Sequence, residues 1–294
     1  MSGRRQRRRA LGRGGLSLRL RALGWSLVYL AGGFGLSVAL LWLIPNTVRL
    51  AFGEALSLAA VQTVVLLVSF GLFSWLVGGR VLGLRLTDFG VVPAGRGVRR
   101  FGVGLLLGLA LAALAMVIAV PAGGASWRDD GGTPGAWLAT VLGTAAILLP
   151  AALAEELIFR GVPLVALSKA FGRWPALTGL SMLFGLAHLL NPGVTPLAVV
   201  NIALAGVFLS LAFFTPGGLW TSSGAHLGWN LGLAGLAAPV SGLPLPLPWL
   251  DYLPGGPRWL TGGSFGPEGG VLGSLCLAGG AYLAARHMTR ETLV

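Results

Sequence analysis

Residues 136–167, AWLATVLGTAAILLPAALAEELIFRGVPLVAL, form an apolar run with three ionisable residues near its end. About 20 apolar residues are enough to cross the hydrocarbon core of a bilayer as a helix, so this run predicts a membrane span. A charged side chain in the middle of a span costs roughly 2.5–3.5 kcal/mol on insertion scales. Glu155, Glu156 and Arg160 therefore need partners or a function inside the membrane.

The composition of the whole chain agrees with a membrane location. Of its 294 residues, 55% are hydrophobic and 10% are charged, whereas soluble domains carry about 25% charged residues. Apolar runs of similar length recur along the chain. We expect an all-α fold, a polytopic transmembrane helical bundle of about eight spans. The expected spans are Trp25–Ile44, Leu56–Gly78, Phe101–Pro121, Ala136 to about Leu167, Pro175–Leu190, Thr195–Phe214, Leu219–Ala238 and Gly269–Ala285.

The positive charges predict how the bundle is oriented. The net charge is +12, and eight arginines precede the first expected span. A basic tail beside a membrane helix indicates the cytoplasmic side and an attraction to anionic lipid, and it argues against nucleic acid as the partner. We therefore expect a cytoplasmic tail at residues 1–22, one transmembrane domain at residues 23–290 and both termini in the cytoplasm of a multi-pass cell-membrane protein. The Pro- and Gly-rich segment 239–268 is expected to be an outer loop whose role the sequence leaves open.

The acidic residues of the quoted run lie on different faces of the expected helix. Glu156 and Arg160 are four residues apart, so they share a face and can form an ion pair. Glu155 points about 100° away from Glu156. No basic residue shares its face, and this leaves Glu155 available for chemistry.

Two other expected spans carry polar groups that we expect to face the interior of the helical bundle. His188 lies in the span 175–190, with Phe184 one turn before it as an apolar wall. His226 and Asn230 lie four residues apart in the span 219–238 and so project together. Polar groups in membrane spans face the interior of the bundle. We therefore expect the three helices to bring these groups and Glu155 to one wet pocket.

A carboxylate, two imidazoles and an amide in one pocket suit the hydrolysis of an acyl compound. Glu155 can take a proton from water, while His188, His226 and Asn230 polarise a carbonyl and stabilise its oxyanion. Glu155, His188 and His226 are also a ligand set that catalytic zinc accepts. The residues alone do not decide between a metal-free and a zinc-assisted reaction.

Other interpretations of these residues are less specific. The Glu156–Arg160 pair can be purely structural, and His226 with Asn230 can hydrogen-bond between helices. Intramembrane acids and histidines also form proton relays, so a proton-coupled transporter is the main alternative, followed by a membrane protein without catalysis. Ser222 and Ser223 lie close to His226 on the same helix, an arrangement that does not suit a serine hydrolase.

Three short motifs resemble a known family. EELIFR at 155–160, FGLAH at 184–188 and HLGWN at 226–230 resemble, in this order, the motifs of the CPBP family of intramembrane endopeptidases, which contains CAAX prenyl proteases and bacteriocin-processing (Abi) proteins. The resemblance covers about residues 135–240, which would be the catalytic core. It implies that Glu155 activates water, that His188, His226 and Asn230 bind the water, the oxyanion or a metal, and that Glu156 and Arg160 support them. It also implies a peptide or lipidated protein as substrate, and for some members a role in bacteriocin immunity.

Overall fold

The computed structural model describes residues 2–43 and 54–288, with side chains for residues 15–43 and 58–288. The expected span end at Ile44, Arg49 in the loop that follows it and residues 289–290 of the expected domain lie outside the described part. The longer helices are α1 (Ser2–Leu43), α3 (Glu54–Phe73), α4 (Ala94–Ala119), α5 (Pro134–Arg160), α6 (Val162–Phe171), α7 (Arg173–Ala187), α8 (Pro196–Phe213), α9 (Leu219–Ala234) and α11 (Val271–Arg286). The short elements are η1 (Ser74–Val81), η2 (Leu86–Phe89), α10 (Arg258–Thr261), η3 (Gly263–Phe265), η4 (Pro267–Gly269) and the strands β1 (Ala125–Arg128) and β2 (Asp251–Pro254).

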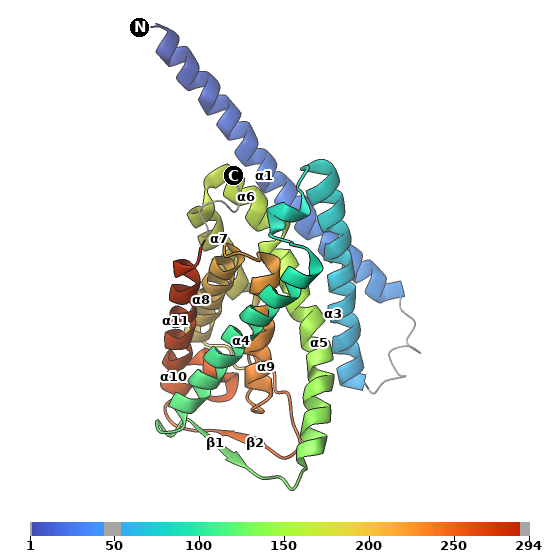
Figure 1. Ribbon diagram of the computed structural model, residues 1–294, viewed down its shortest axis with the longest axis vertical. Coiled ribbons are helices and arrows are strands. Elements are labelled where there is room, and N and C mark those ends of the chain that lie inside the picture. The colour runs from blue at the N-terminus through green and yellow to red at the C-terminus, as the bar shows by residue number, and fades with distance from the viewer. Residues whose placement is uncertain (1, 44–53, 289–294) are drawn as a thin grey trace.

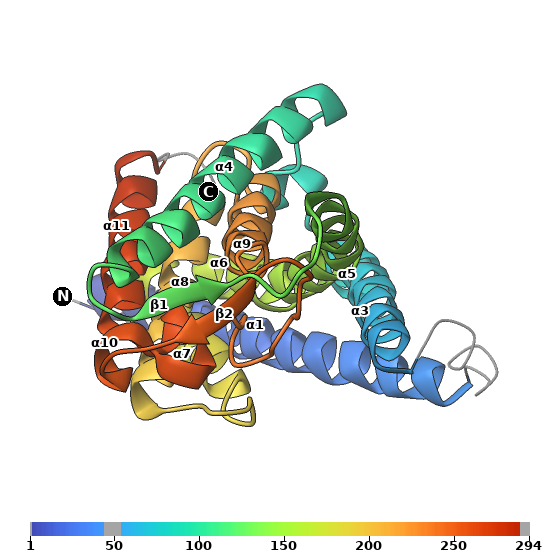
Figure 2. The same cartoon turned by 90° about the horizontal axis from the view of Figure 1, so that it is seen from below.

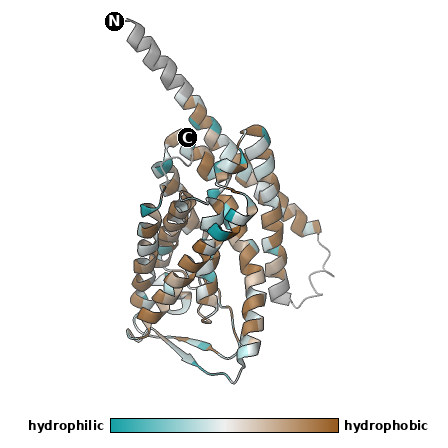
Figure 3. Ribbon diagram, viewed as in Figure 1, coloured by the Kyte–Doolittle hydropathy of each residue, from teal (hydrophilic) through white to brown (hydrophobic). Residues whose placement is uncertain are grey.

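The fold is the expected helical bundle, with α1 and α3 beside a group formed by α4, α5, α7, α8, α9 and α11 (Figure 1). Hydrophobic residues run along the helices in Figure 3. Many large apolar side chains face outward, among them Leu106, Val117, Leu142 and Val200, which are each more than half exposed. Such a surface is stable in lipid rather than in water. The protein is therefore a membrane protein with several apolar helices.

The count of about eight spans stays a prediction, because the lengths of the helices support only part of it. Five helical segments of the described residues are long and apolar enough to cross a membrane: Gly15–Leu43, Leu58–Val81, Leu86–Ala119, Pro134–Phe171 and Pro196–Phe213. The other expected spans correspond to α7, α9 and α11, whose lengths are 15, 16 and 16 residues. Each of these three helices is shorter than the roughly 20 residues that cross a bilayer at right angles.

Several helix boundaries also differ from the sequence prediction. The run from Ala136 to about Leu167 is not one helix, because it breaks at Gly161 into α5 and α6. The helix expected to reach Leu190 ends at Ala187, and His188 caps it. The backbone of α1 is helical from Ser2, so the basic tail and the first span form one continuous helix.

Close packing of α4 against α9 determines which face of α9 is available to the site. A Cβ atom added to Gly104 or Gly108 of α4 would lie 2.2 Å from a backbone oxygen of α9, and Gly224 and Gly228 of α9 meet α4 in the same way. Small residues four apart allow membrane helices to approach this closely. His226 is two residues from both Gly224 and Gly228, about 200° around the helix. It therefore points away from α4 and toward α5.

The end of the bundle opposite the N-terminus carries a small sheet that the all-α prediction did not include. Strands β1 and β2 pair antiparallel, with Ala125 opposite Pro254 and Arg128 opposite Asp251. They lie across this end of the bundle (Figure 2), and the Trp127 indole Nε1 donates a hydrogen bond of 2.8 Å to Leu236 O after α9. Segment 239–268 therefore contains parts that pack against the bundle as well as loops.

The start of α1 and the end of α11 lie on the side away from this sheet. In Figure 1 the start of α1 and the end of α11 lie at the same end of the bundle, and α6, which carries Lys169, lies there as well. The sequence predicts that both termini lie on one side because of the distribution of arginines. The assignment of that side to the cytoplasm stays a prediction.

Candidate active site

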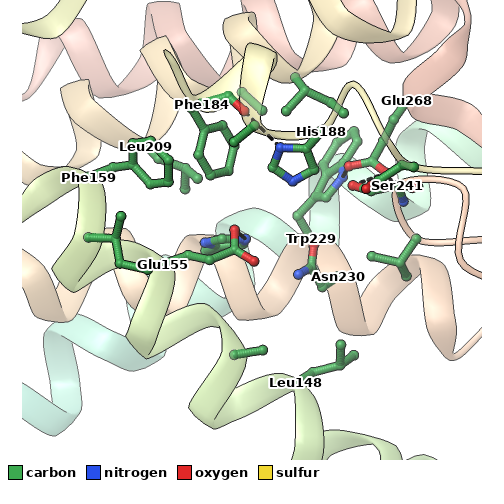
Figure 4. Close-up of a pocket in the computed structure, with 18 of the residues that line it drawn as sticks. Leu148, Glu155, Phe159, Phe184, His188, Leu209, Trp229, Asn230, Ser241 and Glu268 are labelled. Atoms are coloured by element: carbon green, nitrogen blue, oxygen red, sulfur yellow. Dashed lines mark hydrogen bonds and ion pairs between the residues drawn. The ribbon is translucent and has the colours of Figure 1, made fainter. Parts of the chain in front are cut away.

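Polar residues from three helices line one cavity of about 430 Å³. Its walls include Glu155 of α5, Phe184 of α7, His188 just after α7, and His226 and Asn230 of α9 (Figure 4). The four residues that we predicted to be catalytic therefore line the same space. Residues from α1, α3, α8, α11 and the segment after α9 complete it, and most of these are apolar.

The ion pair predicted within α5 is present and completely buried. Arg160 Nη1 lies 3.0 Å from Glu156 Oε1, and the side chains are 1% and 0% exposed. The guanidinium also donates to Gly206 O at 3.1 Å and to Ser210 Oγ at 3.4 Å on α8. Its Cζ lies 4.5 Å from the centre of the Phe184 ring. The pair thus joins α5 to α7 and α8 at the edge of the cavity.

His226 lies between two carboxylates that are neighbours in the sequence. Its Nδ1 is 2.9 Å from Glu156 Oε1, and its Nε2 is 3.7 Å from Glu155 Oε2. An ionised carboxylate can only accept, so Nδ1–H donates to Glu156. Glu155 is 35% exposed and opens to the cavity, while His226 is 8% exposed. The expectation that Glu155 lacks a basic neighbour holds for its own helix, but α9 supplies one.

The orientation of His188 follows from the end of α7. Its Nδ1 lies 2.7 Å from Phe184 O, and a carbonyl can only accept, so Nδ1 carries a hydrogen. Its other nitrogen, Nε2, is then the one available to the cavity (Figure 4). The Phe184 ring lies 4.9 Å from the His188 ring and 6.0 Å from the His226 ring. Phe184 is thus the apolar wall that the sequence predicted.

Asn230 lies one turn after His226 on the cavity face of α9. Among the described residues, no hydrogen bond uses its side-chain amide or the Glu155 carboxylate. Both groups are therefore available to a bound molecule. The amide nitrogen is a donor and the carboxylate is an acceptor.

The residues do not form a metal site. Within the described ranges, no group of three or more His, Cys, Asp or Glu side chains lies close enough to hold a metal ion. Phe184 O and Glu156 engage the Nδ1 atoms of His188 and His226, which leaves one Nε2 on each ring. Glu155, His188 and His226 share the cavity, but in the described part of the chain they are not gathered closely enough to form the zinc site that the sequence left open.

The sequence analysis missed a second acid in the cavity. Glu268 of η4 was assigned to an outer loop, yet it is 4% exposed and lines the cavity together with Trp229 and Ser241. Burial raises the pKa of the Glu268 carboxyl, and hydrogen bonds from Ser241 and Trp229 oppose this shift. Glu268 lies among the glycines of residues 262–270. Hydropathy alone, which we used to divide the sequence into spans and loops, did not predict that it would be buried.

Comparison with known proteins adds a family to this geometry. Residues 136–232 match the family model described as Type II CAAX prenyl endopeptidase Rce1-like. No curated protein and no solved structure matches the chain. The matched segment contains all three motifs, from Glu155 to Asn230. The resemblance carried by these motifs is therefore confirmed over residues 136–232 as similarity to the Rce1-like type II CAAX prenyl endopeptidases.

Proposed function

We propose that this protein is an intramembrane endopeptidase that hydrolyses a peptide bond with water activated by Glu155. The observation that carries the proposal is the meeting of Glu155, His188, His226 and Asn230 around one cavity, with Glu155 Oε2 only 3.7 Å from His226 Nε2. A partly exposed carboxylate can act as a general base, and imidazole and amide groups can stabilise an oxyanion, which are the roles that amide hydrolysis needs.

The position of the attacking water follows from the distance between Glu155 and His226. At 3.7 Å the two atoms are too far apart for a direct hydrogen bond, but a water molecule about 2.8 Å from each can bridge them. Glu155 takes a proton from this water as its oxygen attacks the carbonyl carbon. The His188 Nε2 is a second acceptor that orients the water.

Asn230 and then His226 stabilise the charge that develops on the carbonyl oxygen. Asn230 donates to this oxygen through its amide nitrogen. His226 Nε2, when it carries a proton, holds the water before the attack and donates to the carbonyl oxygen once the water oxygen has bonded to carbon. Glu156 accepts from Nδ1 and so fixes the ring. The C–N bond then breaks, and the proton held by Glu155 passes to the leaving amine nitrogen. No step of this scheme requires a metal.

The substrate class follows from the location and lining of the cavity. The polar groups are surrounded by apolar residues such as Phe34, Leu66 and Leu148, contributed by α1, α3 and α5. A peptide with a lipid chain or an apolar segment can enter such a site from the membrane. The family match favours a prenylated protein with a CAAX-type C-terminus as the first substrate to test.

The test uses purified protein in proteoliposomes with a fluorogenic farnesylated CAAX peptide. Glu155→Gln keeps the shape of the side chain but cannot accept the proton of water, so hydrolysis should fall at least about 100-fold, the lower end of general-base contributions. Asp251→Asn, an acid of β2 outside the cavity, is the matched control and should retain activity. Full activity of Glu155→Gln refutes the proposal. Proton-coupled solute uptake without any hydrolysis would favour a transporter instead, and neither activity would favour a non-catalytic membrane protein.

A further inference from the structure

The mechanism above does not use Glu268, although this acid is buried in the wall of the same cavity. Trp229 Nε1 donates to Glu268 Oε1 at 3.0 Å. The backbone nitrogen of Ser241 donates to Glu268 Oε2, and Ser241 Oγ lies 3.1 Å from the same oxygen. N–H groups can only donate, so both carboxyl oxygens act as acceptors. Glu268 therefore ties α9 to the segment that follows it.

The backbone around Glu268 is itself held by two helices. Asn201 of α8, which is 1% exposed, donates to Glu268 O at 2.8 Å and to Gly270 O at 2.9 Å. Ser274 of α11 donates to Asn201 Oδ1 at 2.6 Å. Buried amide groups with all their partners satisfied are rigid. These hydrogen bonds therefore hold in place the backbone that carries the Glu268 carboxyl group.

The segment that Glu268 holds forms a wall of the cavity. Val240, Ser241 and Leu243 line it, and Ser241 O accepts a hydrogen bond of 2.8 Å from Asn191, three residues after His188. In Figure 4, Ser241 and Glu268 lie together on the His188 side of the cavity, and Glu155 lies on the other side. A peptide placed for attack near Glu155 would meet residues 240–243.

We propose that Glu268 is a positioning residue, which fixes residues 240–243 and Trp229 as the wall that orients the substrate toward Glu155. This inference rests on the proposed endopeptidase function. Three donors already engage its two oxygens, so we assign Glu268 to positioning rather than to proton transfer. Its effect is on how the substrate binds, and residues 240–243 become the part of the chain that selects the substrate residue next to the cleaved bond.

The first test separates binding from chemistry. Glu268→Gln keeps one acceptor oxygen but places an NH₂ group where the other acceptor was, so it cannot satisfy both Trp229 and the Ser241 backbone. We expect KM for the farnesylated peptide to rise about fivefold, the factor expected for one hydrogen bond, while kcat changes less than about twofold. Trp229→Phe removes one donor and keeps most of the ring, and its effect should not add to that of Glu268→Gln. Asp251→Asn is again the control.

The second test does not depend on activity. Leu243 lines the cavity and is 51% exposed, so Leu243→Cys in a Cys276→Ser background can be labelled with a maleimide in detergent micelles. Glu268→Gln should change the labelling rate by at least about threefold, because the wall loses an anchor. Trp229→Phe provides the same comparison if Glu268→Gln does not fold.

The outcomes distinguish the two proposals. A rise in KM together with a changed labelling rate supports the positioning role. An unchanged labelling rate, or a loss confined to kcat, overturns it even when Glu155→Gln is inactive. If Glu155→Gln is fully active, the endopeptidase proposal fails, and the labelling rate still shows whether Glu268 fixes the wall.

Discussion

The contacts of the buried ion pair in α5 predict how much stability the protein loses when the pair is broken. Arg160→Met replaces the guanidinium by an apolar chain of similar length. Glu156 then keeps the His226 contact on Oε1, and its Oε2 has no hydrogen-bond partner among the described residues. Gly206 O and Ser210 Oγ also lose their donor. The variant thus leaves a fully buried carboxylate without its counter-ion.

The expected loss of stability is about 3–5 kcal/mol, the cost of breaking a buried pair by removal of one partner. Glu156→Gln in the same chain removes the uncompensated charge, so the double variant should be more stable than the sum of the single effects by about 2 kcal/mol. An exposed pair provides the matched control. Arg128 and Asp251 also form an ion pair, but their side chains are 68% and 42% exposed, and Arg128→Met should cost at most about 1 kcal/mol.

The assay is reversible unfolding in mixed micelles with increasing sodium dodecyl sulfate, followed by circular dichroism. The free energy of unfolding of Arg160→Met is compared with those of Arg128→Met and of the double variant. If Arg160→Met is no less stable than Arg128→Met, the pair does not hold α5, α7 and α8 together. If the effects of Glu156→Gln and Arg160→Met simply add, the two side chains do not act as a unit.

Three further predictions concern other parts of the molecule. Gly228→Val should prevent close packing of α4 and α9 and lower the yield of folded monomer in gel filtration, whereas Gly102→Val, which meets no neighbouring atom within 4 Å, should not. Tyr29→Phe removes a hydrogen bond of 2.9 Å to Leu157 O and should lower the free energy of unfolding by about 1 kcal/mol; a loss below about 0.3 kcal/mol would contradict a role for Tyr29 in joining α1 to α5. Incubation with EDTA or phenanthroline should leave kcat of the purified protein unchanged, and a loss that added zinc restores would contradict the metal-free scheme.

The sequence predicted those parts of the site that depend on one helix at a time. The four-residue spacing was sufficient to pair Glu156 with Arg160 and to place His226 beside Asn230, because helical geometry is local. The convergence of three spans also followed from chemistry, since polar groups in a membrane must face one another. The same reasoning predicted the position of Phe184 beside His188.

The remaining features depend on contacts between segments far apart in the chain. Hydropathy alone could not show that the run after Ala136 would break at Gly161, or that Glu268 would fold back into the cavity. The 3.7 Å separation of Glu155 and His226 depends on how closely α9 packs against α4. The glycines at 104, 108, 224 and 228 carried that information as two small-residue repeats, which the sequence analysis did not use.

Because Glu155 and Glu156 are adjacent, the geometry of the site depends on the number of residues in this part of α5 and not only on which residues they are. Because α9 presents one imidazole between two consecutive carboxylates, inserting a single residue in the preceding turns would rotate both acids by about 100° and shift them by about 1.5 Å. Neither ring nitrogen would then face its acid. Protein engineers can accordingly exchange the lipid-facing side chains of this helix, but they should keep the number of residues between its kink-prone Pro150 and Arg160 fixed.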